Sequence, residues 1–430
     1  MRTELAAAAL LWIQLAPIAQ AQTTPRLDTT TFVVVGEGLA AGMANYGLSE
    51  VVQDKSFPAQ MARQMKTAFP QPLIQGPGIG DLLGYKPLPV RMPHYPQTTV
   101  RVFPQRTDGE PEAPSLFVLN LSVPGMKLAD SLHLRPVPPL IQDNNRQQTV
   151  INMILGFPAL ILNRDVPLWS QVEYAEAMNP TFALVALGYH EALEAAVGGD
   201  PSKMPNPAEF RANYSTILKR LRALNAEVLA TTIPDPMDTA YFTQPVPAAG
   251  LLQTPPFVVL LGYNLKVEDY ITRNGLSTIG NQLLRRKIEP LPPGSVMTAA
   301  VAAEIRSRVR ALNTAITEAA RESGAQVFDL HALFAGIRAA GANAGSRRIG
   351  ANYLGGFYSL DGFYPGATGH ALIANEILTF LNRTYEQSFP LLNISAIAAE
   401  DPTVEARPAG GPLFQALEFG ISEPAEGVSQ

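Results

Sequence analysis

Five short apolar runs, separated by stretches of helical periodicity, constrain the fold of this 430-residue chain more than any other feature. Apolar side chains follow one another within each run, which is typical of parallel strands that are buried on both faces. Helices that alternate with such strands form right-handed crossovers and cover both sides of a parallel sheet. The runs span residues 32–35, 116–121, 182–187, 227–232 and 326–330.

Apolar residues at helical spacing precede the fourth and fifth runs. We expect one helix from Phe210, Tyr214, Ile217, Leu218, Leu221 and Leu224, and another from Val301, Ile305, Val309, Leu312 and Ile316. A closing helix is expected at about residues 371–381. The pattern predicts an α/β protein with a three-layer α/β/α sandwich.

The first 21 residues resemble a secretory signal peptide. Arg2 precedes an apolar stretch that is too short to act as a membrane-spanning stop-transfer helix, and Ala19-Gln20-Ala21 fits a small-x-small cleavage site. We therefore expect a mature chain that starts at Gln22 and is exported to a periplasmic, envelope-associated or extracellular location. The alternative is an uncleaved N-terminal anchor. No later segment is long and apolar enough to predict a transmembrane helix.

Residues 22–398 are expected to form a single domain with long loop insertions. Segments at about 71–114, 235–294 and 340–356 are rich in Pro, Gly, Ala or Asn and interrupt the alternation of strands and helices. Loops of this length are typical of lids, binding loops or small subdomains. Residues 399–430 have no periodicity and are expected to be a disordered tail.

Composition narrows the classes of partner. The net charge is −5 and there is no basic block, which argues against nucleic acid and against anionic membrane surfaces. The chain has no cysteine, so disulfides and thiolate metal sites are excluded. The spacing of Gly36, Gly38 and Gly42 is one residue away from the dinucleotide fingerprint, and no histidine pair has metal-binding spacing. We expect no cofactor and no metal.

Four sequence blocks follow in a characteristic order. They are Gly36-Glu37-Gly38-Leu39, Asn120-Leu121-Ser122-Val123-Pro124-Gly125, Gly188-Tyr189-His190-Glu191 and Ser359-Leu360-Asp361-Gly362-Phe363-Tyr364-Pro365. Together they resemble the SGNH/GDSL hydrolase (lipase and esterase) family over about residues 30–397. The resemblance implies a flavodoxin-like parallel sheet of five strands in the order 2-1-3-4-5, with a cleft at the carboxyl ends of the strands.

The family hydrolyses esters with a serine nucleophile, a histidine base and an orienting aspartate, while amides and an asparagine hold the oxyanion. The resemblance places Gly38 at the nucleophile, Tyr364 at the base and His190 at the asparagine. It retains Asp361 at the triad acid and Gly125 in the oxyanion cradle. Glycine cannot attack, and a phenol with a pKa of about 10 is a poor base near neutral pH.

These replacements predict a catalytically inactive relative that binds a small ester, a glycan or an acylated molecule in the former cleft, with Gly125, His190 and Glu191 as ligand contacts. A second hypothesis is a hydrolase with a rearranged site. Its candidate groups are His190 or His370 as base, Ser122 or Ser359 as nucleophile, or water activated by Asp361 and Glu191. We expect the His370 ring to point away from the cleft, and His94, His133 and His331 to have no catalytic role. A third hypothesis is an envelope scaffold whose loops at 71–114 and 235–294 make the contacts.

Overall fold

The computed structural model describes residues 26–76, 78–80, 100–101, 118–156, 159–160 and 167–405. The expected signal peptide and its cleavage site, His94, most of the first long loop, and residues 406–430 of the expected tail lie outside the described residues. The architecture below concerns the described residues alone.

A parallel sheet of four strands forms the centre of the molecule. Its order is β1 (Phe32–Gly36), β6 (Phe182–Ala186), β7 (Glu227–Thr231) and β11 (Gln326–Phe328). β1 pairs with β6 in register from Phe32 opposite Phe182, and these two rings stack at 5.1 Å between centroids. Every residue of β1 and β6 is buried, which explains why both appear in the sequence as continuous apolar runs.

The fifth strand expected at residues 116–121 is reduced, among the described residues, to a single parallel bridge between Val34 and Asn120. The N–H of Val34 donates to the carbonyl of Leu119 at 2.9 Å, and the N–H of Leu121 donates back to Val34 at 2.9 Å. The order 2-1-3-4-5 is therefore confirmed, but the outer position next to β1 holds a bridge rather than a strand.

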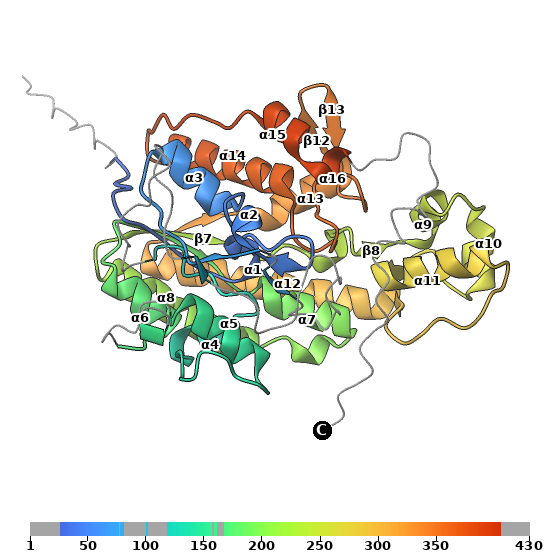
Figure 1. Ribbon diagram of the computed structural model, residues 1–430, viewed down its shortest axis with the longest axis horizontal. Helices are drawn as coiled ribbons and strands as arrows, with labels where there is room; N and C mark the ends of the chain where they lie inside the picture. The colour runs from blue at the N-terminus through green and yellow to red at the C-terminus, as the bar shows by residue number, and fades with distance from the viewer. Residues whose placement is uncertain are drawn as a thin grey trace, which may run out of the picture.

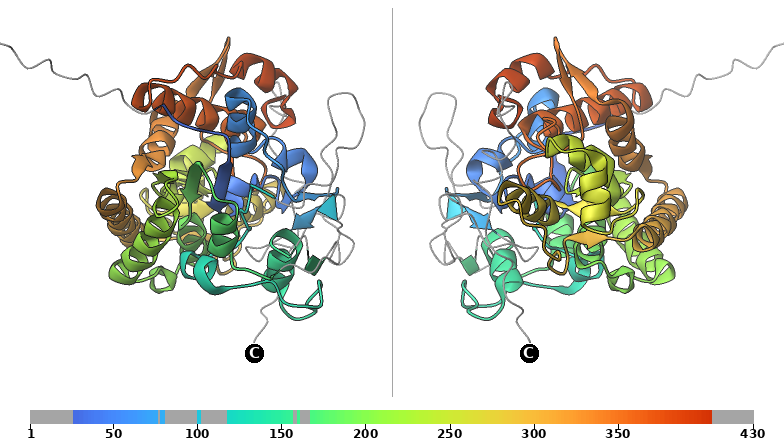
Figure 2. Two further views of the ribbon diagram at one scale, coloured as in Figure 1. Left: turned by 90° about the vertical axis from the view of Figure 1, so that its left-hand side faces the viewer. Right: turned by 90° about the vertical axis from the view of Figure 1, so that its right-hand side faces the viewer.

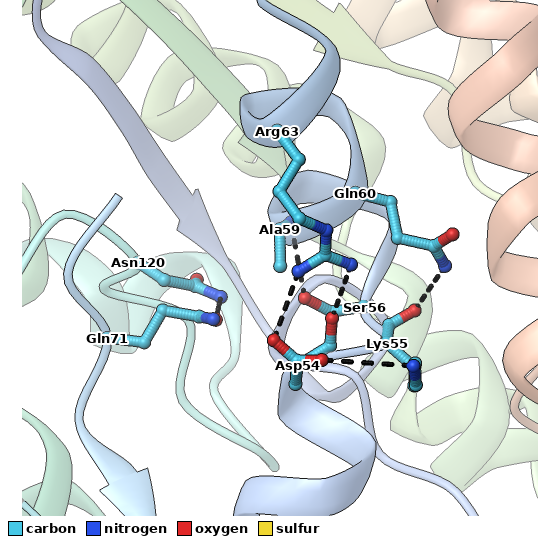
Figure 3. A network of polar contacts seen from close by, with 8 residues as sticks. All are labelled: Asp54, Lys55, Ser56, Ala59, Gln60, Arg63, Gln71 and Asn120. Atoms are coloured by element: carbon cyan, nitrogen blue, oxygen red, sulfur yellow. Dashed lines mark hydrogen bonds and ion pairs between the residues drawn. The ribbon is translucent and has the colours of Figure 1, made fainter. Parts of the chain in front are cut away.

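Two side-chain amides support this shortened edge. The Asn120 Nδ2 atom donates to Gln71 at 2.9 Å, as Figure 3 shows, and to the carbonyl of Ala40 at 3.3 Å. Gln171, which is fully buried, donates through Nε2 to the carbonyls of Gly36 and Leu121, both at 2.7 Å. Side chains thus provide the hydrogen bonds that a longer strand would supply through its backbone.

Helices cover both faces of the sheet (Figures 1 and 2). On one face, α3 (Phe57–Met65) packs against α14 (Ala367–Thr384). On the other face lie α4 (Leu128–His133), α6 (Gln171–Ala177), α8 (Pro207–Arg222) and α12 (Ala299–Ser323), of which α8 and α12 pack together most extensively. The expected three-layer α/β/α sandwich is confirmed, and so are the helices expected before β7, before β11 and near the end of the chain.

The start of α3 is fixed by a local polar network (Figure 3). Ser56 caps the helix by accepting the N–H of Ala59 at 3.4 Å. Arg63 donates to the carboxylate of Asp54 at 3.0 Å and to its carbonyl at 2.8 Å. This network sets the position of Phe57, the first residue of α3, whose N–H donates to the Nδ1 atom of His370 at 3.3 Å.

The second long insertion forms a separate lobe, residues 242–297, with its own small core. A three-stranded antiparallel sheet in the order β10 (Val296–Met297), β9 (Tyr270–Thr272) and β8 (Phe242–Thr243) joins three helices. The helices are α9 (Pro245–Leu251), α10 (Pro256–Gly262) and α11 (Arg273–Leu284). The lobe projects at one end of the long axis of the molecule (Figure 1).

Further helices are short or flank the site. They are α1 (Gly38–Ala41), α2 (Glu50–Gln53), α5 (Arg146–Ile154), α7 (Tyr189–Gly198) and α13 (Leu330–Ala340). Three two-stranded sheets pair β2 (Gly47–Leu48) with β4 (Ile79–Gly80), β3 (Leu73–Ile74) with β5 (Val100–Arg101), and β12 (Ala342–Ala344) with β13 (Arg347–Ile349). Within the described ranges, no helix is both long enough and apolar enough to cross a bilayer.

The predicted start of the tail needs a correction. Residues 399–405 belong to α15 (Ile394–Glu400) and α16 (Pro402–Glu405). Asp401, which is buried, accepts hydrogen bonds from the N–H and the hydroxyl of Thr368 at 2.8 Å each. This carboxylate anchors the segment to the first turn of α14, where a negative charge is favourable.

Substitution of Gln171 by methionine should lower the free energy of unfolding by about 1–3 kcal/mol, because the buried carbonyl of Leu121 loses a hydrogen-bond donor. The carbonyl of Gly36, the other acceptor of Gln171, still accepts the N–H of Val123 at 3.1 Å. Chemical unfolding of Gln171→Met measures the effect. The control is Gln326→Met on the exposed first residue of β11, and equal losses in the two variants would contradict the proposed role.

Candidate functional site

The turn after β1 places residue 38 at the carboxyl edge of the sheet. Glu37 caps α1 by accepting the N–H of Leu39 at 3.1 Å. Gly42 ends the helix with a φ of +85°, in the left-handed region, and a Cβ there would lie 2.6 Å from the Cβ of Ser56. A tight strand–turn–helix unit therefore holds Gly38 in a fixed position.

The space above Gly38 is occupied by Tyr364. A Cβ atom built on residue 38 would lie 2.6 Å from the Tyr364 hydroxyl oxygen, 2.9 Å from the Cζ of the ring and 3.1 Å from the Met43 sulfur. The Tyr364 side chain is only 2% exposed, so it has little freedom to withdraw. The residue at the base position thus fills the volume that a side chain at the nucleophile position would need.

Asp361 holds the loop that carries Tyr364. Its Oδ1 atom accepts the N–H groups of Phe363 at 2.8 Å and Tyr364 at 2.9 Å, and its Oδ2 atom accepts the N–H of Tyr46 at 3.2 Å. Burial raises the pKa of this carboxyl, and the backbone hydrogen bonds oppose that shift. The predicted triad acid therefore bonds to backbone amides within the described residues.

Tyr189, the first residue of α7, packs against Tyr364. Its ring meets the ring of Tyr364 edge-on at 6.1 Å between centroids, and its hydroxyl donates to the carbonyl of Phe363 at 2.9 Å. The sequence pattern alone gives Tyr189 no role. The available signal was an aromatic residue in the third block, directly before His190.

Glu37 is a second functional candidate that the sequence analysis did not select. Its side chain is buried, and desolvation raises the pKa of the carboxyl to about 8, with a further rise from the charge of Glu191. The Oε2 atom has no hydrogen-bond partner among the described residues. Glu37 is therefore largely protonated at neutral pH, directly beside the position of the absent nucleophile.

Glu191 and His190 lie in the first turn of α7. The Glu191 Oε1 atom accepts the N–H of Leu128 at 2.7 Å, its Oε2 atom has no partner in the described part of the chain, and burial raises its pKa to about 7. Burial lowers the pKa of His190 to about 4, opposed by the charge of Glu194. The imidazole is neutral at neutral pH and a weak base.

Gly125, the predicted oxyanion residue, is covered by a glutamine. It has a φ of +76°, and a Cβ there would collide with the side-chain amide of Gln147. That amide donates to the carbonyl of Pro124 at 3.0 Å. A glycine is thus needed here for its backbone conformation and for the close approach of Gln147.

The groups of the rearranged-site hypothesis do not form a catalytic pair. The Ser359 hydroxyl accepts the N–H of Asn45 at 2.9 Å, and the buried Ser122 hydroxyl has no partner in the described part of the chain. His370 lies buried within α14, where its Nδ1 atom accepts the N–H of Phe57 at 3.3 Å and burial lowers its pKa to about 3. Among the residues that the structure describes, no serine hydroxyl bonds to a histidine ring.

The described residues also contain no cluster of three or more His, Asp or Glu side chains that could hold a metal ion. His331 lies at the start of α13, with its Nδ1 atom 3.1 Å from the carbonyl of Ile233. His133 is in the last turn of α4.

A cavity of about 100 Å³ opens next to Glu191, between α4, α7 and α8. Its lining includes Lys127, Glu191, Lys203, Phe210 and Asn213. Lys127 makes an ion pair with Glu194 at 2.7 Å. The cavity thus combines two ammonium groups, an apolar ring and two carboxyls, those of Glu191 and Glu209.

The blocks predicted from the sequence converge at neighbouring strand ends. Gly38 and Tyr364 meet after β1, Asp361 holds their loop, and α7 begins after β6, the strand that pairs with β1. This arrangement and the strand order together identify the fold. The fold is SGNH/GDSL-hydrolase-like.

Comparisons with known proteins find distant likeness among solved structures. No family model and no curated protein matches the sequence. Similar solved structures include TesA (12% identity, 82% of this chain and 98% of TesA covered, TM-score 0.32). Others are LAE5, an alpha/beta hydrolase enzyme from the metagenome of Lake Arreo, Spain (10%, 83% and 96%, 0.35), and phospholipase A1 from Streptomyces albidoflavus NA297 (12%, 83% and 100%, 0.34). Likeness at these scores carries no argument about activity.

Substitution of Gly38 by serine should lower the free energy of unfolding by about 1–3 kcal/mol, because the new side chain overlaps a packed ring. The cost should be smaller in a Tyr364→His background, where the shorter side chain leaves room. Chemical unfolding of both single variants and the double variant gives the coupling energy.

The matched control is Gly336→Ser in α13, where a new Cβ would have no neighbour within 4 Å. We expect little change in stability there. Strict additivity of Gly38→Ser and Tyr364→His would mean that the two side chains do not compete for the same space.

The protonated Glu37 carboxyl should make stability pH-dependent. Its folded pKa of about 8 exceeds the ordinary value of 4.5, so its stabilising contribution is complete below about pH 4.5 and is lost as the pH rises through about 8. Glu37→Gln keeps the capping acceptor and cannot ionise. We expect a smaller fall in unfolding free energy between about pH 5 and about pH 8 than in the unmodified protein. Glu304→Gln on the exposed face of α12 is the control, and an unchanged fall in Glu37→Gln would refute the assignment.

Proposed function

We propose that this protein is a catalytically inactive relative of the SGNH/GDSL hydrolases that binds a small ligand. The observation that carries the proposal is the Tyr364 hydroxyl, which lies 2.6 Å from the position of a Cβ on residue 38. The nucleophile is absent, and a buried phenol fills the space in which it would stand.

The energetic consequence for hydrolysis is large. Loss of the nucleophile or the base of a triad lowers turnover by a factor of about 10⁶, and loss of both costs little more. The pKa values of His190 and His370, about 4 and about 3, leave neither imidazole as an effective base at neutral pH. Gln147 covers Gly125, so the oxyanion cradle is altered as well.

We place the ligand in the cavity beside Glu191 rather than at Gly38. The centre at Gly38 is packed with side chains, whereas the cavity of about 100 Å³ accommodates a small group. Lys127 and Lys203 can donate to carbonyl, carboxylate or sugar oxygens, and the carboxyls of Glu191 and Glu209 line the same cavity. This donor set suits the polar head of a small ester, a glycan or an acylated molecule.

Export through the N-terminal segment remains part of the proposal. The cysteine-free composition is compatible with an oxidising compartment, because no thiol is present to be oxidised there. The compartment would be the periplasm, the envelope or the exterior of the cell.

A rearranged hydrolase is the second candidate. The observation that favours it is the pair of buried carboxyls, Glu37 and Glu191, with pKa values of about 8 and about 7. Carboxyls with pKa values near the working pH can act as general acids or bases on water. The two candidates differ in whether any ester is turned over. An envelope scaffold, the third hypothesis, would act through the lobe.

Purified protein should hydrolyse short-chain nitrophenyl esters no faster than a protein-free blank, and a fluorophosphonate probe should label no serine. The triple variant Gly38→Ser, His190→Asn, Tyr364→His restores the expected side chains and the room for them. In a folded triple variant we expect detectable esterase activity and labelling at residue 38.

Turnover by the unmodified protein that falls in Glu37→Gln or Glu191→Gln would support the rearranged site and overturn the proposal. Labelling of Ser122 or Ser359 would do the same. A folded triple variant without activity would show that the centre has changed beyond these three positions.

A further inference from the structure

Apolar side chains are exposed unevenly over the described surface. Large apolar residues that are exposed cluster in the lobe, and they are Val246 (44% exposed), Phe257 (61%), Leu261 (80%), Val267 (51%), Leu284 (56%) and Ile288 (51%). The rest of the described chain contributes only Val51, Val137 and Leu391. Exposed apolar patches of this kind mark interaction sites.

The most exposed residues lie on one face of α10. Phe257 and Leu261 are four residues apart, which places them next to each other on a helix surface. Val259, on the opposite face, is fully buried in the small core of the lobe. Helix α10 forms the outer edge of the lobe, at the end of the molecule (Figure 1).

A basic run lies against the end of this helix. Residues 284–290 are all exposed and read Leu284-Arg285-Arg286-Lys287-Ile288-Glu289-Pro290. The Ile288 side chain lies 3.1 Å from the position of a Cβ on Gly262, the last residue of α10. The basic run is therefore adjacent to the end of α10, and Lys266, four residues after this helix, is a further exposed cation.

The local charge is opposite to that of the whole chain. The protein has a net charge of −5, yet four exposed cations on this surface face only two exposed carboxylates, Glu268 and Glu289. Lys287 forms an ion pair with Glu289. Apolar side chains flanked by cations match a bilayer surface, where acyl chains lie below anionic headgroups.

We propose that the outer surface of the lobe, formed by α10 and residues 284–288, docks the protein onto an anionic lipid membrane. Phe257 and Leu261 enter the interface, while Arg285, Arg286 and Lys266 lie at the headgroup phosphates. A second copy of the chain fits this surface poorly, because a two-fold interface would bring the same cations together. The sequence-wide charge, which argued against anionic membranes, conceals this local surface.

Sedimentation with vesicles tests the proposal on the full chain. Vesicles of phosphatidylcholine with about one third phosphatidylglycerol should bind the protein, vesicles of phosphatidylcholine alone should bind it at least about fivefold less, and raised salt should weaken binding. Phe257→Ser with Leu261→Ser, and separately Arg285→Gln with Arg286→Gln, should each reduce binding by about tenfold.

Two controls make matched changes elsewhere. Val51→Ser removes an apolar side chain that is 69% exposed on α2, and Arg310→Gln with Arg321→Gln removes two exposed cations on α12. Both should bind vesicles as the unmodified protein does. Equal binding to neutral vesicles, no binding to either kind, or equal losses in the controls would overturn the proposal. Self-association that is lost in Phe257→Ser with Leu261→Ser, without vesicle binding, would assign the surface to a second copy.

Discussion

The contact between Tyr364 and the backbone of Gly38 determines which side chains the turn after β1 can accommodate. The relation is reciprocal, because only a residue without a Cβ leaves room for the phenol, and the phenol excludes any larger residue at position 38. Asp361 fixes this contact by accepting the backbone N–H groups of Tyr46 and Tyr364. Asp361, which the resemblance assigns to the triad acid, here accepts backbone N–H groups of the loop that carries Tyr364.

Glu37 and Glu191 are carboxyl side chains that are buried in a mainly apolar core, which is energetically unfavourable. A buried oxygen without a partner destabilises a fold by about 1–3 kcal/mol, and each of these residues has one such oxygen among the described contacts. Such departures from good packing are typical of functional sites. Glu191 is one of the residues that line the cavity, whereas Glu37 lies beside the filled position. This difference favours binding at α7 over chemistry at α1.

The sequence predicts the architecture well, because strands buried on both faces leave an unbroken apolar pattern. It predicts the edge of the sheet less well, since the run at 116–121 looks like the others, but the partners of Asn120 and Gln171 come from distant loops and helices. The motif blocks locate Gly38, Asp361 and Tyr364, but the collision between residues 38 and 364 depends on packing in three dimensions. The tail boundary is wrong by several residues, because Asp401 is anchored to Thr368 by a tertiary contact that leaves no periodic signal.

The two cores of the protein explain how binding surfaces can change while the fold persists. The lobe buries Ala248, Leu252 and Ile279 in a small core of its own, while Phe242, Tyr270 and Met297 of its sheet belong to the core that surrounds the parallel sheet. Phe257 and Leu261, on the exposed face of α10, belong to neither core, so changes there should affect the packing under β1 and β6 little. Under the proposed function, the sheet is a rigid support, and specificity lies in the cavity beside α7 and in the lobe.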